Sequence, residues 1–163
     1  MSMGRPASAL LACVSSAERA ALQDAVTRAL TARDETGKAG IAAGILQGER
    51  VIATGENEVH LHSDPTRHAE MVAITRAAQG LARSDLSDCV MISTLQPCEM
   101  CLSAMRFAGI SRVIFAATKD RVAPKYFVFP HLRLEDFQRG QDFEAIGGIC
   151  EDRVLHLYAT GEE

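Results

Sequence analysis

Two short runs of the sequence carry the residue types of a metal site. The first is His68-Ala69-Glu70, and the second is Pro97-Cys98-Glu99-Met100-Cys101. One histidine and two cysteines at C-x-x-C spacing supply nitrogen and sulfur ligands, which suit a zinc ion that keeps its fourth position open for water. Glu70, two residues after His68, can lie beside that open position without binding the metal. The two runs therefore predict a catalytic metal site.

A closed structural zinc site and a redox dithiol are the alternative explanations of the C-x-x-C pair. A closed site needs a fourth protein ligand, and the sequence has no second C-x-x-C or H-x-x-x-H to supply it. A thioredoxin-like redox pair would account for the two cysteines but not for the His68-Ala69-Glu70 run. We therefore favour the open site, in which Cys98 and Cys101 face the same way in the first turn of a helix. The N-terminus of that helix is expected to lower the pKa of both thiols.

The order H-x-E followed by P-C-x-x-C resembles the zinc-dependent cytidine and deoxycytidylate deaminase superfamily. The resemblance covers about residues 40–118 and continues more loosely to the C-terminus. It implies a Zn²⁺ cofactor, a histidine and two cysteines that bind it, and a glutamate that moves protons during hydrolytic deamination: His68, Cys98, Cys101 and Glu70. It also implies that backbone N–H groups around Ala69 and Cys98 hold the carbonyl group of the substrate.

Residues before the H-x-E run refine the expected substrate. Asp64-Pro65-Thr66 resembles the D-P-T run of guanine deaminases and tRNA adenosine deaminases, in which Ala commonly stands where this chain has Arg67. Asn57 falls where the family carries an asparagine that hydrogen-bonds the base. A turn role is the alternative for Asn57, and we favour the contact with the base. Arg67 is either a solvated charge or the partner of an acidic group at the pocket rim.

The segment after residue 118 is expected to close over the substrate. Asp120 lies close to where guanine deaminases carry an acidic residue, and residues 125–131 are rich in rings. One of three rings is expected to stack on a planar base, with simple apolar packing as the alternative for each: Tyr126, Phe127 and Phe129. His60 and His62 precede the motif in a polar stretch, and we interpret them as surface residues.

The rest of the chain supplies strands and helices that position these runs. A capping box over residues 15–18 begins a helix that ends near Arg33, and a hairpin of two strands follows at 41–46 and 51–54. The polar residues 56–67 predict a loop whose side chains contribute to the site. Further along, the pattern predicts helices over 69–82 and 97–108, strands over 89–94 and 112–117, a short helix within 132–139, a strand over 143–149 and a last helix over 150–159.

This alternation of strands and helices predicts an α/β fold. The resemblance implies a three-layer α/β/α sandwich with a central mixed five-stranded sheet. A chain of 163 residues, of which 47% are hydrophobic and 23% charged, suits a single domain over residues 1–163.

Charge and hydropathy limit the expected partners and location. The formal net charge of −4 disfavours a long polyanion and so argues against nucleic acid. No apolar run reaches the ~18 residues that span a membrane, and metal thiolates suit a reducing cytoplasm. Superfamily members of this size are generally dimers or tetramers, so the resemblance implies a homodimer, with the helix over 97–108 as a candidate interface.

Several functions are consistent with these observations. A zinc-dependent deaminase of a free nucleobase or nucleoside is our first hypothesis, with guanine as first choice because of the D-P-T run and the extended C-terminal segment. Cytosine or another amino-heterocycle is the next alternative. A tRNA adenosine deaminase is disfavoured by the acidic charge balance. A deaminase-like binding module without activity is disfavoured because the ligand residues and Glu70 are intact.

Overall fold

A five-stranded mixed sheet forms the centre of the protein, with strand order β2-β1-β3-β4-β5. The computed structural model describes residues 13–37 and 40–161. The neighbours of β1 are antiparallel to it, whereas β3, β4 and β5 run parallel. The strands are β1 (Ala42–Gln47), β2 (Arg50–Glu56), β3 (Cys89–Leu95), β4 (Arg112–Ala117) and β5 (Glu144–Ile146).

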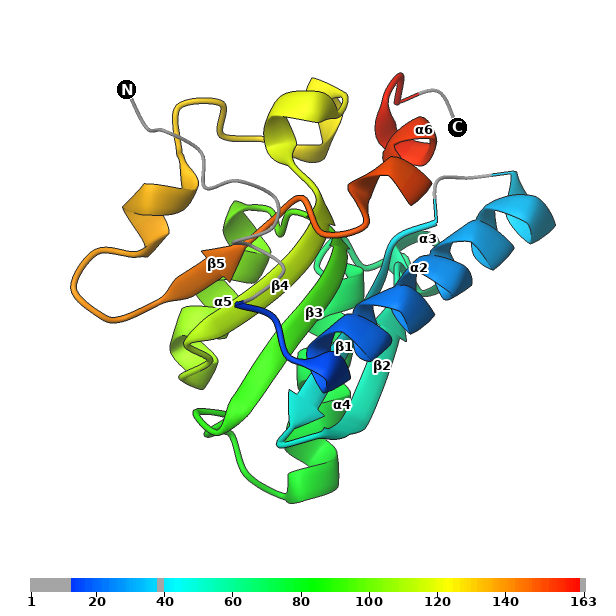
Figure 1. The fold of residues 1–163 in the computed structure, drawn as a ribbon. Coiled ribbons are helices and arrows are strands. Elements are labelled where there is room, and N and C mark those ends of the chain that lie inside the picture. The colour runs from blue at the N-terminus through cyan, green and yellow to red at the C-terminus, as the bar shows by residue number, and fades with distance from the viewer. Residues whose placement is uncertain (1–12, 38–39, 162–163) are drawn as a thin grey trace.

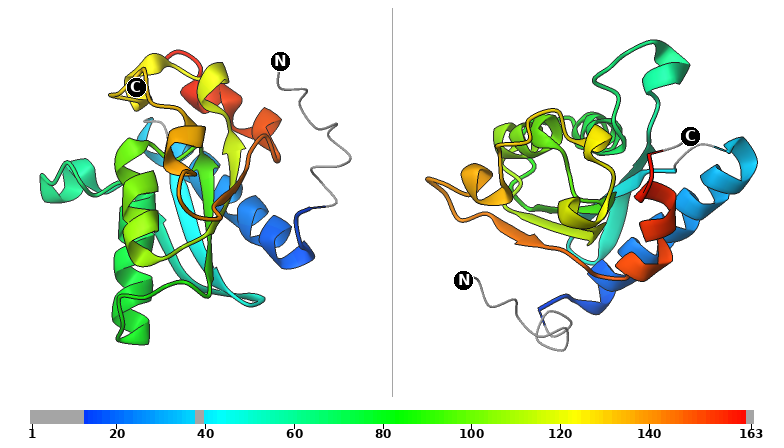
Figure 2. Two further views of the ribbon diagram at one scale, coloured as in Figure 1. Left: turned by 90° about the vertical axis from the view of Figure 1, so that its left-hand side faces the viewer. Right: turned by 90° about the horizontal axis from the view of Figure 1, so that it is seen from above.

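Helices cover both faces of this sheet (Figure 1). Helices α2 (Ser16–Thr36) and α6 (Leu155–Tyr158) lie on one face, and α4 (Ala69–Leu81) and α5 (Glu99–Ala108) lie on the other (Figure 2). Each face has its own apolar cluster, one built on α2 and α6 and the other on α4 and α5. The predicted three-layer α/β/α sandwich with a mixed five-stranded sheet is confirmed.

Helix α2 forms where the sequence predicts it and extends slightly further. Ser15 accepts a hydrogen bond from the Glu18 backbone, and the Glu18 side chain accepts one from the Ser15 backbone, which completes the predicted capping box. The helix passes the predicted end near Arg33 and stops at Gly37, whose φ of 72° is the left-handed conformation that glycine adopts at low cost.

The starts of α4 and α5 are fixed by neighbouring strands. Helix α4 packs closely on β2 at Gly55, where an added Cβ atom would lie 2.4 Å from the Ala69 carbonyl oxygen. Helix α5 begins a few residues beyond the end of β3. The two helix starts therefore lie side by side at the carboxyl end of the parallel strands, which is the usual position of ligand sites in α/β sheets.

Three predicted segments differ from the structure. The predicted loop over 56–67 contains a short helix, α3 (Val59–His62). The predicted strand over 143–149 is shortened to β5, because Gly147 packs against the Phe115 ring and Gly148 has a φ of 81°. The predicted helix over 150–159 is a 3-10 turn (Glu151–Arg153) followed by α6, because Val154 leaves helical geometry with φ −121° and ψ −11°.

Irregular structure fills the segment between β4 and β5. It contains 3-10 turns over Lys119–Arg121, Pro124–Tyr126 and Leu134–Phe137, the last of which lies within the predicted short helix. None of the helices among the described residues is long and apolar enough to cross a membrane. The prediction that residues 1–163 form one domain reaches beyond the described residues and stays a prediction.

Candidate metal and catalytic site

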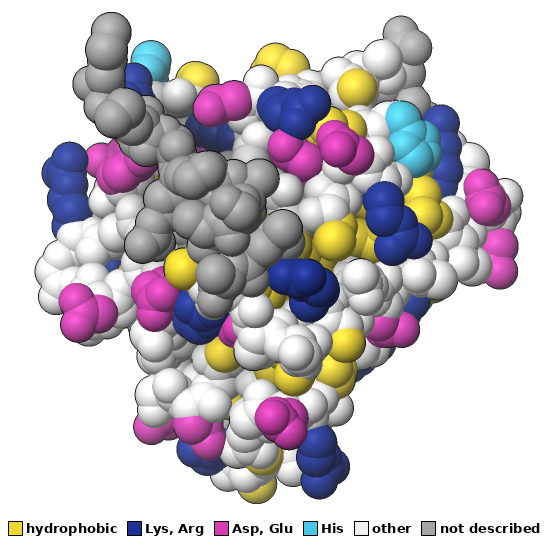
Figure 3. Space-filling model, viewed as in Figure 1, with side chains coloured by type: hydrophobic (Ala, Val, Ile, Leu, Met, Phe, Trp, Pro, Cys, Tyr) yellow, Lys and Arg dark blue, Asp and Glu magenta, His cyan; other side chains and the backbone are white. Residues whose placement is uncertain are grey.

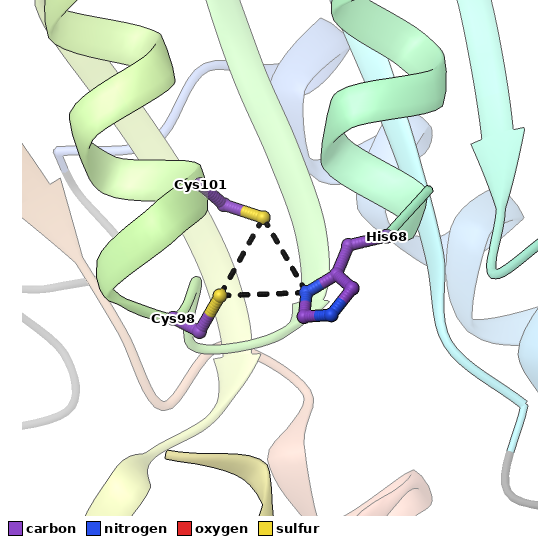
Figure 4. Close-up of side chains that lie close together, drawn as sticks. All are labelled: His68, Cys98 and Cys101. Atoms are coloured by element: carbon purple, nitrogen blue, oxygen red, sulfur yellow. Dashed lines mark hydrogen bonds between the residues drawn. The ribbon is translucent and has the colours of Figure 1, made fainter. Parts of the chain in front are cut away.

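One histidine and two cysteines meet between the starts of α4 and α5 (Figure 4). His68 Nδ1 lies 3.4 Å from Cys98 Sγ and 3.7 Å from Cys101 Sγ, and the two sulfur atoms are 3.7 Å apart. A tetrahedral zinc ion, with bonds of about 2.3 Å to sulfur and 2.0 Å to nitrogen, holds such atoms roughly 3.5–3.8 Å apart. The triangle therefore has the chemistry and the dimensions of three zinc ligands.

Helix capping explains why these side chains converge. His68 is the N-cap residue of α4, Cys98 is the N-cap residue of α5, and both have the extended backbone conformation of that position. An N-cap side chain normally bonds a backbone N–H of its own helix. Here the two side chains contact each other across the gap between the helices, and Cys101 joins them from the first turn of α5.

The two thiols of the group differ in acidity. Cys98 accepts a hydrogen bond from Cys101, which lowers the pKa of Cys98 to about 4. His68 acts in the same direction, and burial acts against it. The same contact with Cys98, together with burial, raises the pKa of Cys101. The lowered pKa that was expected for both thiols is therefore found for Cys98 and not for Cys101. Metal binding requires that both thiols be deprotonated.

Glu70 lies beside the triangle in a dry environment, with 4% of its surface exposed. Burial, reinforced by the negative charge of Cys98, raises the pKa of its carboxyl group. Ser93 Oγ lies 3.1 Å from Glu70 Oε1 and 2.7 Å from the Leu95 carbonyl oxygen. A hydroxyl group has one proton to donate, so Ser93 can serve only one of these acceptors at a time. Its hydrogen bond to Glu70 lowers the pKa of the carboxyl group but does not outweigh burial.

A cavity of about 280 Å³ opens onto these residues. This volume is near the lower end of the roughly 300–1,000 Å³ that small-molecule sites occupy. Three of the predicted substrate-binding residues line it, namely Asn57, Ala69 and Tyr126. The other lining residues are Ile41, His60, His68, Glu70, Leu95, Gln96, Cys98, Lys125 and Val128.

The remaining predicted substrate-binding residues lie elsewhere. Asp120 lines a neighbouring cavity of about 690 Å³. Phe127 is buried, with Lys119 Nζ 5.0 Å from the centre of its ring, and Phe129 is exposed. After the 3-10 turn over Pro124–Tyr126, alternate residues face the cavity: Tyr126 and Val128 line it, whereas Phe127 and Phe129 do not. Tyr126 is held there edge-on against the Tyr158 ring, with ring centres 5.8 Å apart.

Asn57 is a turn residue whose side chain also lines the cavity. Its Oδ1 atom accepts a hydrogen bond of 2.9 Å from the Val59 backbone, as expected for a turn residue. Its side chain also lines the cavity. Because the oxygen is engaged, the amide NH₂ group is the part of Asn57 that remains to donate to a bound molecule.

Three polar residues that line the cavity were not predicted from the sequence. Gln96 follows β3 directly, and the rule that ligands bind beyond the carboxyl ends of strands could have found it. His60, interpreted as a surface residue, is exposed but also lines the cavity from the first turn of α3. Lys125 reaches the cavity through the 3-10 turn before Tyr126, and we find no sequence signal for it.

Comparison with known families agrees with this geometry. Residues 15–117 match the cytidine and deoxycytidylate deaminase zinc-binding region. The chain belongs to this family. A zinc-binding family and a His/Cys/Cys group of suitable dimensions together identify Zn²⁺ as the cofactor.

Individual relatives differ in substrate. The chain is 39% identical to guanine deaminase of Bacillus subtilis over 104 residues, which are 61% of this chain and 67% of that protein. It is also 39% identical to the tRNA-specific adenosine deaminase of Aquifex aeolicus over 83 residues, 51% of this chain and 55% of that protein. Among solved structures, a tRNA:A34 deaminase superposes with a TM-score of 0.72 at 26% identity, over 85% of this chain and 98% of that chain.

Proposed function

We propose that this protein is a zinc-dependent hydrolytic deaminase of a free nucleobase or nucleoside, with guanine as the first substrate to test. The overall reaction converts an amino-heterocycle and water into the oxo-heterocycle and ammonia. The observation that carries the proposal is the meeting of a His/Cys/Cys group and the buried carboxyl group of Glu70 at one small cavity. A deaminase needs both parts at the same carbon atom of its substrate.

In this proposal His68, Cys98 and Cys101 bind the zinc ion. When bound, the ion supplies Lewis acidity that lowers the pKa of a water molecule. Glu70, as a carboxylate, accepts one proton from the attacking water and delivers it to a ring nitrogen. It then accepts the second proton from the hydroxyl group on the attacked carbon and transfers it to the departing amine, which leaves as ammonia. The dry surroundings that raise the pKa of Glu70 allow it to keep the proton between these steps.

The cavity walls would orient the ring. The Asn57 NH₂ group can donate to a ring nitrogen or carbonyl oxygen, and the Ala69 N–H, one of the first of α4, is not needed for helix bonding. Tyr126 supplies an apolar wall for a planar heterocycle. Gln96 offers a further amide, although its Oε1 atom already accepts a hydrogen bond from the Lys119 backbone.

A free base or nucleoside is favoured over tRNA by charge. The formal net charge is −4, and binding of a polyanion usually requires a basic surface. On the face in view in Figure 3, Lys and Arg side chains are interspersed with Asp and Glu. The likeness to tRNA adenosine deaminases makes tRNA the second candidate, and the likeness to guanine deaminase supports guanine.

A substrate panel tests this proposal. Zinc-loaded protein is incubated with aminopurines, aminopyrimidines, their nucleosides and tRNA containing a wobble adenosine. We expect ammonia from free bases, guanine foremost, and little inosine in the tRNA. Efficient conversion of adenosine to inosine in tRNA, with no ammonia from any base or nucleoside, would overturn the substrate choice.

We further propose that the protein acts as a homodimer in the cytoplasm, where a reducing environment preserves thiolate ligands. Helix α5 supports the dimer because Phe107, near its end, is 94% exposed. Large aromatic side chains that are exposed in the monomer are typical of subunit interfaces.

A further inference from the structure

The connection between β2 and α4, residues 57–68, begins and ends at the site. Asn57, at its start, lines the cavity, and His68, at its end, belongs to the metal-binding group. Between them the chain forms α3, which projects from the body of the protein in both views of Figure 2. The relative position of Asn57 and His68 therefore depends on what holds the two ends of this projection together.

Glu58 and Arg67 join these two ends twice. The Glu58 backbone N–H donates to the Arg67 carbonyl oxygen at 2.9 Å. Arg67 Nη2 donates to Glu58 Oε2 at 3.1 Å. The Glu58 side chain is 14% exposed, so this ion pair is shielded from water far more than a surface pair. Glu58 directly follows Asn57, and Arg67 directly precedes His68.

A second arginine fastens the pair to the rest of the fold. Arg76, in the middle of α4, donates through Nη2 to Glu58 Oε1 at 3.0 Å and through Nη1 to the Thr54 carbonyl oxygen of β2 at 2.9 Å. Both oxygens of the Glu58 carboxylate thus have an arginine partner. His62 Nε2 lies 3.6 Å from Oε2, at the exposed side of the group. The charged group links β2, the projection and α4.

Arg67 has features that a solvated charge lacks. Its guanidinium group contacts Glu58, and its Nε atom is buried without a hydrogen-bond partner among the described residues. A buried donor left without a partner costs free energy. This cost falls on the residue directly before the metal-binding His68.

We propose that Glu58 and Arg67 form a positioning clamp for the site. The clamp sets the spacing between the Asn57 amide and the His68 imidazole, and so aligns the substrate-binding donor with the metal ligand. The alignment of Asn57 rests on the proposed function, whereas the placement of His68 does not. Neither clamp residue touches the reacting atoms; each acts through the residue beside it.

The test compares Glu58→Gln, Arg67→Gln and the double variant with the wild type. Arg83→Gln is the control for loss of an arginine ion pair away from the site, because Arg83 pairs with Asp88 at 2.8 Å on the surface beyond the other end of α4. Zinc Kd is measured by competition with a chromophoric chelator, KM and kcat at saturating zinc, and thermal stability by circular dichroism. Residues that orient metal ligands typically contribute 10–100-fold to affinity.

We expect each clamp variant to raise the zinc Kd about tenfold and to raise KM severalfold, with a smaller change in kcat. The double variant should be no worse than Glu58→Gln alone, because Glu58→Gln already removes the ion pair with Arg67. Arg67→Lys, which keeps the charge, should recover part of the zinc affinity. Arg83→Gln should leave the zinc Kd and KM unchanged.

Zinc Kd values within twofold of the wild type for both single variants, or additive effects in the double variant, would overturn the clamp. If Glu58→Gln does not fold, the comparison of Arg67→Gln with Arg67→Lys decides the question. If the wild type releases ammonia from no substrate, the proposed function fails. The zinc competition and the double-variant comparison still test the clamp in that case.

Discussion

The two N-cap positions of the site show how single residues trade local stability for chemistry. Serine, threonine, aspartate and asparagine are preferred there because they bond the first N–H groups of the helix. His68 and Cys98 occupy these positions and direct their side chains to each other. Zinc binding compensates for the lost caps, because metal ligation contributes free energy to folding.

Replacement of one ligand should therefore remove the metal. We expect Cys98→Ala to lose most of its zinc and to unfold at a lower temperature, because two remaining ligands bind zinc far more weakly than three. Elemental analysis after dialysis and a thermal scan measure both effects. Cys13→Ala, which changes an exposed cysteine outside the site, is the control and should keep its zinc. Full zinc retention in Cys98→Ala would remove Cys98 from the ligand set.

The sequence predicted site residues to different degrees, for physical reasons. The ligand group could be predicted because C-x-x-C spacing at a helix start places two thiols on one side whatever the surroundings. Tyr126 could be predicted only as one of three rings, because the choice depends on a 3-10 turn that no local pattern marks. His60 and Lys125 could not be predicted, since their place at the cavity depends on the short helix α3 and on the 3-10 turn over Pro124–Tyr126, which no apolar periodicity marks.

At the scale of elements, the packing of β2 on α4 fixes the position of the histidine ligand. Gly55 permits this contact, because a Cβ atom there would lie 2.4 Å from the Ala69 carbonyl oxygen and 2.8 Å from the Ala73 nitrogen. Both atoms belong to the backbone of α4, so relief of the clash requires that the helix move. Such a movement would displace His68, the residue just before Ala69.

Gly55→Ala should accordingly lower the free energy of unfolding by about 1–3 kcal/mol, the usual cost of overpacking, and weaken zinc binding. Chemical denaturation and zinc competition measure the two effects. Gly80→Ala is the matched control, because nothing lies within 4 Å of the added atom and the position is helical. It should be neutral or stabilising by up to about 1 kcal/mol. Equal behaviour of the two variants would contradict the role of Gly55.

The start of α2 is tied to β4 by an ion pair that depends on pH. Arg112 donates to both carboxylate oxygens of Glu18, at 2.7 and 3.0 Å. Burial tends to raise the pKa of Glu18, but the bonds from Arg112 and Ser15 outweigh it and hold the pKa below its ordinary value of 4.5. A depressed pKa in the folded state stabilises the protein above 4.5, and this stability is lost as pH falls through the folded-state pKa.

Glu18→Gln should therefore lower the free energy of unfolding by about 2 kcal/mol at neutral pH, and the difference from the wild type should shrink toward about pH 3. Urea titrations at both pH values measure this. Glu144→Gln is the control, because Glu144 bonds the same arginine but is 66% exposed. Its effect should be below about 1 kcal/mol. A Glu18→Gln deficit that stays constant with pH would contradict the assigned ion pair.

Most elements could be predicted from the sequence, and the exceptions share a cause. The strands and long helices carry clear apolar patterns, and their ends are marked by a capping box, by proline and by glycine. Helix α3 has four residues and no buried side chain, so it has no apolar periodicity to detect. The C-terminal helix was predicted too long because Val154 departs from helical geometry within an apolar run.

At the scale of the whole molecule, the exposed end of α5 bears on assembly. Phe107 is 94% exposed, and we expect it to be buried in the proposed homodimer. Light scattering at micromolar concentration should give twice the monomer mass for the wild type and a lower mass for Phe107→Ser. Leu61→Ser, which changes an exposed apolar residue of α3, should remain dimeric. A monomer mass for the wild type would contradict the homodimer.

The central claim is that zinc and Glu70 act together on a small amino-heterocycle. The most direct measurement is the rate of ammonia release from guanine by the wild type and by Glu70→Gln, each with its zinc content determined on the same sample. We predict one zinc per chain in both proteins, release of ammonia by the wild type, and a rate at least 100-fold lower in Glu70→Gln, the scale of general acid–base catalysis. A Glu70→Gln variant with the wild-type rate, or a zinc-loaded wild type that releases no ammonia from guanine or any other base or nucleoside, would contradict the claim.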